Sequence, residues 1–174
     1  MRSTALAVVF VALSSTFAQS SRPWHEALPI TWGVVTEGWQ LALSAEKQSY
    51  FSNEPIQMIL AAHNTAGKRR VARRTSPWDA ANFTIVRVPD RTAVILRPPR
   101  DEVDRRKRQL VGGTRVIDVE AGGTMHPGFL DLRTLFDLPP GTYTIQATCK
   151  LPNLAWTADI NIPSNQITIS VVAR

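Results

Sequence analysis

The chain has 174 residues, of which 44% are hydrophobic and 20% charged, with a formal net charge of +6 and one cysteine. This length is typical of one domain with a two-layer core. A single cysteine excludes an internal disulfide, so the fold depends on its hydrophobic core. No segment reaches the about 20 apolar residues that cross a bilayer, so no transmembrane anchor is expected.

Residues 1–20 have the organisation of a secretory signal peptide. Arg2 provides a positive start, the stretch Ala5–Leu13 is almost entirely apolar, and small residues follow at Ala18 and Ser20. The apolar stretch is shorter than a membrane-spanning helix. The sequence therefore predicts a protein that is secreted or periplasmic after this segment is cleaved.

The next segment, residues 21–38, is predicted to be an irregular lead-in. It contains Pro23, Trp24, Pro29 and Trp32 and shows neither a period of 2 nor a period of 3.6. We expect its tryptophans to hold it in part against the domain that follows.

From Trp39 onward, apolar and polar residues alternate in short runs, which is typical of strands with one buried face. The runs cover residues 39–44, 56–63, 83–88, 92–96, 114–119, 142–149 and 166–172. The runs 83–88 and 92–96 predict a hairpin, and 101–108 is the one helix candidate. The pattern predicts an all-β, immunoglobulin-like β-sandwich of about seven to nine antiparallel strands over residues 39–174.

The basic residues are concentrated between positions 68 and 108, where 13 Lys or Arg stand against five acids. The candidate anion- or partner-binding residues are Lys68, Arg69, Arg70, Arg73 and Arg74, together with Arg105, Arg106, Lys107 and Arg108 of a basic insertion near residues 97–113. No acid offsets the first group locally, so it is suited to anionic polymers. The alternative is a pair of solvated loops. Nucleic acid is not expected as a partner, because no aromatic residues are interleaved with these bases.

The segment Asp137–Tyr143 predicts a tyrosine corner. Pro140 fixes φ, Gly141 permits a positive φ, and Tyr143 begins the next alternating run. In such a corner the phenol hydroxyl bonds to the backbone a few residues upstream. The alternative is an ordinary turn followed by a strand tyrosine.

Three segments in order, 41–56, 131–145 and 164–168, carry a resemblance to a known family. They resemble the immunoglobulin-like domains of exported bacterial proteins, including the domain that precedes the catalytic part of some deuterolysin-type metallopeptidases. The chain is similar, more loosely, to proteinase-inhibitor domains of the BsuPI type. The resemblance implies a fold and brings no catalytic residue with it.

The sequence contains no complete catalytic or metal-binding motif. His25-Glu26 lacks the second histidine of a zinc-protease motif, and His63, His126 and Cys149 lack the close spacing of metal ligands. No nucleophile elbow, phosphate loop or dinucleotide fingerprint is present. The sequence therefore predicts a non-enzyme without cofactor or metal.

Three functions remain open from the sequence. The first is a non-catalytic interaction module that binds an unknown protein partner at the cell envelope or exterior. The second is a protease inhibitor or pro-domain-like module, which depends on the resemblance alone. The third is binding to an anionic polymer or surface through residues 68–108.

Overall fold

The computed structural model describes residues 30–74, 81–96, 115–153, 155 and 157–174. The predicted signal peptide, the first part of the lead-in, the basic insertion near 97–113 and the helix candidate at 101–108 lie outside these residues. The described chain is almost entirely β-structure, so the predicted all-β class is confirmed. None of its described helices is long and apolar enough to cross a membrane.

Nine strands and one short 3-10 turn, Leu132–Thr134, are formed within the described residues. The strands are β1 (Trp39–Ala45), β2 (Ser49–Phe51), β3 (Gln57–Asn64), β4 (Arg70–Arg74), β5 (Ala81–Val88), β6 (Arg115–Val119), β7 (Thr124–Asp131), β8 (Gly141–Pro152) and β9 (Asp159–Val172).

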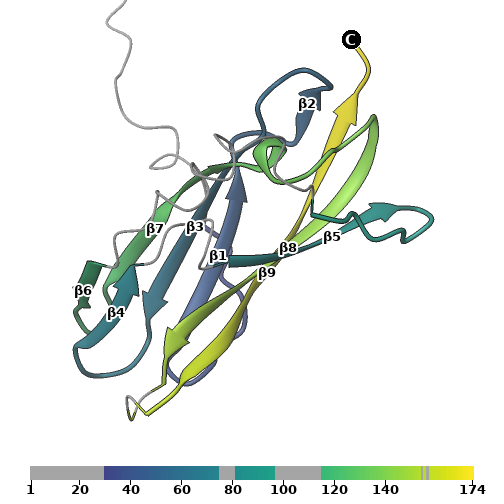
Figure 1. The fold of residues 1–174 in the computed structure, drawn as a ribbon. Coiled ribbons are helices and arrows are strands. Elements are labelled where there is room, and N and C mark those ends of the chain that lie inside the picture. Colours follow the sequence, from purple (N-terminus) through teal and green to yellow (C-terminus); the bar gives the residue numbers. More distant parts are fainter. Residues whose placement is uncertain (1–29, 75–80, 97–114, 154, 156) are drawn as a thin grey trace, which may run out of the picture.

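Seven strands form one mixed sheet in the order β5-β8-β9-β1-β3-β7, with β2 also paired to β9 (Figure 1). β4 and β6 form a separate two-stranded sheet. β9 is antiparallel to β8 but parallel to both β1 and β2. The prediction of purely antiparallel strands is therefore wrong, because the last strand runs in the same direction as the first two strands beside it.

The core is one continuous cluster of side chains from β1, β3, β5, β7, β8 and β9. On β8, Tyr143, Ile145, Ala147 and Cys149 are buried and alternate with half-buried polar residues, as the sequence predicts. This alternation arises because successive side chains of a strand point to opposite faces.

Some elements differ from the prediction. β5 is confirmed, but residues 92–96 add only isolated bridges, Val86 to Ala93 and Leu96 to Phe136, rather than a full second hairpin strand. β2, β4 and β7 were not predicted, and the alternative of a solvated loop at residues 68–74 is wrong because residues 70–74 pair with β6. β7 contains Pro127 and Gly128, which interrupt alternation and disfavour strands in sequence-based analysis.

The buried side chain of Asn64 joins three segments at one end of the molecule. Its Nδ2 lies 2.9 Å from the Lys68 carbonyl oxygen and 3.0 Å from the carbonyl oxygens of Val119 and Glu120. Its Oδ1 accepts the Ala66 N–H at 3.0 Å. One amide thus connects the end of β3 with the following turn and with the end of β6.

Candidate functional site

The predicted corner contains the backbone contact expected of it. The buried Tyr143 hydroxyl donates to the Pro139 carbonyl oxygen at 2.5 Å, while Asp137 is exposed. The predicted positive φ at Gly141 is wrong, because its φ does not lie in the positive region. A Cβ at Gly141 would lie 2.9 Å from Nε of Arg87, whose Nη2 donates to the Pro140 carbonyl oxygen at 3.0 Å.

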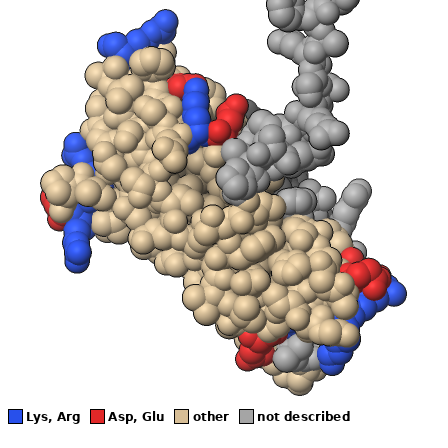
Figure 2. Space-filling view, turned by 180° about the vertical axis from the view of Figure 1, so that it is seen from behind, with Lys and Arg blue, Asp and Glu red and all other residues tan. Residues whose placement is uncertain are grey.

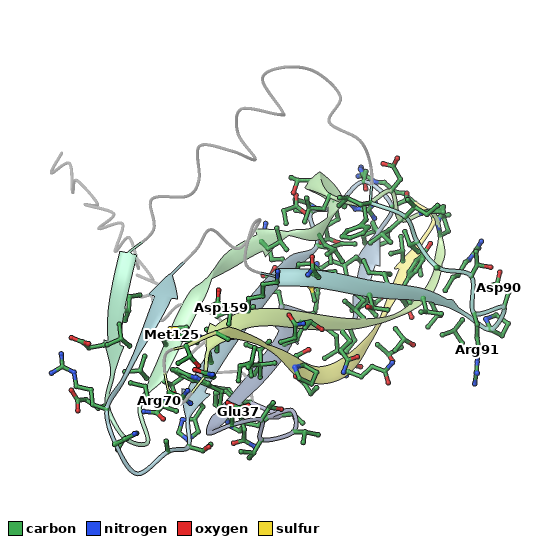
Figure 3. All side chains as sticks on the ribbon, turned by 60° about the horizontal axis from the view of Figure 1, so that its bottom comes forward. Glu37, Arg70, Asp90, Arg91, Met125 and Asp159 are labelled. Carbon is green, nitrogen blue, oxygen red and sulfur yellow. The ribbon has the colours of Figure 1, made fainter. Side chains whose placement is uncertain are left out.

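Arg70 was predicted to bind anions at the surface, and this prediction is wrong. The residue is only 2% exposed, and its guanidinium lies 4.5 Å from the Trp39 ring centroid. Its Nη1 donates to the Glu37 carbonyl oxygen at 2.7 Å and its Nη2 to the Pro152 carbonyl oxygen at 2.8 Å. Figure 3 shows Arg70 beside Glu37 at one end of the molecule. Burial lowers the pKa of Arg70.

The side chains around Arg70 explain why it is buried rather than exposed. Trp39 packs against its face, and the indole Nε1 donates to the same Pro152 oxygen at 3.2 Å. The aromatic ring and the two carbonyl acceptors replace the water contacts that the Arg70 guanidinium loses on burial. Arg70 therefore has a structural role and is not available to bind an anion at the surface.

The charge of the neighbouring Arg69 is partly neutralised by acidic residues. Arg69 Nη2 hydrogen-bonds the Asp118 carboxylate on β6, and its Nε lies 3.8 Å from Glu120 Oε1. The hydrogen bond and charge of Asp118 raise the pKa of Arg69. The expectation that no acid offsets this group is wrong for Arg69, because β4–β6 pairing brings Asp118 beside it from 49 positions away in the sequence.

The other predicted basic residues are placed only in part. Lys68 is exposed, and Arg73 and Arg74 lie on β4 opposite Val116 and Arg115. The basic residues 105–108 lie outside the described part of the chain. Charged side chains of the described residues gather toward the ends of the molecule, leaving a broad uncharged middle on the face shown in Figure 2.

Cys149 is a free, buried thiol, and burial raises its pKa to about 12. A thiol with so high a pKa is almost entirely protonated at pH 8, and the thiolate is the reactive form. We expect Ellman's reagent at pH 8 to leave the folded protein unmodified and to label one thiol per chain once urea unfolds it. Rapid labelling without denaturant would contradict this burial.

The described histidine and acidic residues form no metal-like group. Among the residues that the structure describes, no three His, Cys, Asp or Glu side chains gather as a metal site would require. His63 instead has its Nδ1 3.1 Å from Thr124 Oγ1 and its ring 5.2 Å from that of Trp32. The ring contact places Trp32 of the lead-in against β3, and the Thr124 contact links β3 to β7.

The outward positions of β2 and β5, of residues 142–148 in β8 and of residues 166–172 in β9 form a surface without charge. We call it the uncharged face; its members alternate with core residues and lie side by side in the strand register. They are Ser49, Phe51, Asn82, Thr84, Val86, Val88, Thr142, Thr144, Gln146, Thr148, Gln166, Thr168, Ser170 and Val172.

One end of the uncharged face is apolar. Phe51 is 52% exposed, Val88 41% and Val172 40%, and Phe51 is the register partner of Val172. The uncharged face contains no Lys, Arg, Asp or Glu, although 20% of the chain is charged. The exposed Lys150 and Asp159 lie farther along β8 and β9, outside this face. Sequence reasoning missed this surface, although the alternating Thr142, Thr144, Gln146 and Thr148 were a visible signal.

The comparisons with known proteins identify no family for this chain. No protein-family model and no curated protein matches the chain. Among solved structures, a β-glucosidase from Erythrobacter marinus is similar with a TM-score of 0.39 and 14% sequence identity. The match covers 82% of this chain but only 16% of the glucosidase chain. At this TM-score the similarity indicates neither a shared fold nor a shared activity.

Proposed function

We propose that this chain is an exported, non-catalytic, protein-binding module with an immunoglobulin-like β-sandwich fold. The observation that carries the proposal is the uncharged face on β2, β5, β8 and β9. The partner is a protein that covers this face.

The strand order supports the sandwich part of the proposal. β1, β3 and β7 are consecutive neighbours, as are β5, β8 and β9, and both groups contribute to one core. The Tyr143 contact with Pro139 is the one found in tyrosine corners of such folds. The resemblance to exported immunoglobulin-like domains points the same way.

The composition of the uncharged face favours a protein partner over open solvent. The solvated side of an antiparallel sheet is ordinarily polar, and the cores of protein interfaces are depleted of charged residues. Here the apolar end at Phe51 and Val172 adjoins hydroxyl and amide side chains. This combination supplies apolar area and uncharged hydrogen-bonding groups without the cost of desolvating ions.

Introducing a charge on the uncharged face tests the proposal. We expect immobilised wild-type protein to retain at least one protein from an envelope extract at near-physiological salt. Thr144→Arg should reduce retention of that protein about tenfold, because a charge buried without a partner opposes binding. Thr65→Arg places the same substitution on an exposed turn and is the matched control.

Two outcomes would refute the proposal. One is that no protein is retained by the wild type, and the other is that Thr144→Arg and Thr65→Arg behave alike. If the retained protein is a protease, assaying it with excess wild-type protein separates inhibition from simple binding.

A further inference from the structure

The sheet is interrupted between β9 and its neighbours β1 and β2. β1 meets β9 at the parallel bridge between Leu41 and Ser164, and pairing resumes only where Ser49 meets Ser170. Between these points, residues 43–48 separate from residues 165–169. We call this opening the β1–β9 fork.

Main-chain groups of β9 point into the fork. The Ser170 N–H donates to the Gln48 carbonyl oxygen at 2.8 Å, and the Val172 carbonyl oxygen accepts from Ser52 N–H at 2.9 Å. Alternate residues of a strand direct these groups to the same side, so those of Gln166 and Thr168 point away from β8 as well. Among the described residues, none bonds to these two N–H and two C=O groups.

The side chain of Asn165 closes the inner end of the fork. Its Oδ1 accepts the Leu43 N–H at 2.6 Å, and its Nδ2 donates to the Leu43 carbonyl oxygen at 3.0 Å. This carboxamide occupies the groups through which β1 would otherwise continue to pair. At the inner end of the fork, these two side-chain hydrogen bonds therefore take the place of main-chain pairing between β1 and β9.

A cavity of about 460 Å³ lies in the fork. Leu43, Ala45 and Ile167 supply the apolar part of its lining, and the other lining residues are polar or charged: Thr31, Ser44, Glu46, Lys47, Gln48, Asn165 and Thr168. This volume falls within the usual range of ligand pockets.

We infer that the β1–β9 fork binds an extended peptide segment by strand addition. The segment pairs with the main-chain groups of Gln166 and Thr168, to which no described residue bonds, and places one apolar side chain against the half-buried Ala45 and Ile167. Only another extended main chain offers alternating donors and acceptors at the spacing of a strand edge. The two sites share Gln166 and Thr168 but use different groups: the fork uses their main-chain groups, and the uncharged face uses their side chains.

Amide hydrogen exchange of the full chain, followed by NMR, tests this inference. The probe is the acetylated and amidated pentapeptide Thr-Val-Thr-Val-Thr. In the free protein the amides of Gln166 and Thr168 should exchange faster than those of Ile167 and Ile169, which point to β8. Added peptide should slow exchange of the first two amides at least about tenfold.

Two variants at position 168 distinguish the contribution of the main-chain N–H to peptide binding from that of the side chain. Thr168→Pro removes the N–H that points into the fork, and we expect it to weaken peptide binding about tenfold. Thr168→Ala keeps the N–H and should bind within about twofold of the wild type. The β8–β9 amide signals report whether each variant is folded.

The inference fails if saturating peptide leaves the Gln166 and Thr168 amides unchanged. It also fails if these amides are already as protected as Ile167 in the free protein, because the chain then covers its own edge. Thr144→Arg leaves the fork intact, so loss of peptide binding and loss of the partner on the uncharged face are distinguishable.

Discussion

Replacing Arg70 by alanine is expected to lower the free energy of unfolding by about 3 kcal/mol. The substitution removes two hydrogen bonds to carbonyl oxygens and the packing of the guanidinium on Trp39. Urea denaturation followed by tryptophan fluorescence measures the change. Arg70→Met, which retains apolar packing on Trp39, should lose about 2 kcal/mol.

Arg69→Ala is the matched control for this experiment. Arg69 is exposed and pairs with Asp118 at the surface, where solvent screens the pair, so its removal should change stability far less than the removal of Arg70. Arg70→Ala should also leave the salt concentration for elution from heparin unchanged, because Arg70 does not reach solvent. Equal stability losses for the two variants would contradict the structural role of Arg70.

Replacing Asn64 by alanine is expected to lower the free energy of unfolding by about 3 kcal/mol as well. The variant leaves the Ala66 N–H and the carbonyl oxygens near Nδ2 without this partner at a buried position. Unsatisfied buried groups bear the full cost of losing water. Thermal or urea unfolding gives the value.

Asn153→Ala provides the comparison for Asn64. Its side chain also makes two hydrogen bonds, both to Thr157, but they are exposed to solvent. Water replaces such bonds, so the loss should be below about 1 kcal/mol. If Asn64→Ala were as mild as Asn153→Ala, the connection between β3 and β6 would not depend on the amide.

The strands with one buried face could be predicted because burial leaves a period of 2 in the sequence. β8 shows this from Tyr143 to Cys149, and β9 shows it at Ile169 and Val171. β7 lacks the signal at Pro127 and Gly128, and its place beside β3 is determined by pairing over a long sequence distance. Local patterns do not encode which strand becomes a neighbour.

The same limit explains the errors at the predicted binding residues. Arg70 and Arg69 are adjacent in a basic run, yet one is buried on Trp39 and the other faces Asp118. Strand alternation assigns them to opposite sides of the chain. The partners that decide their roles come from β1, β6 and β8, so charge counting along the sequence could not separate them.

The position of β9 also has a consequence for the order of folding. β9 carries the Asn165 contacts to Leu43, which join residues 122 positions apart, and its Val172 pairs with Phe51. During synthesis the N-terminal part of the chain is made first, so β1 and β2 are exposed before their partner β9 exists. The pairing of β1 and β2 with β9 therefore forms only after β9 has been synthesised, so it is a late step in folding.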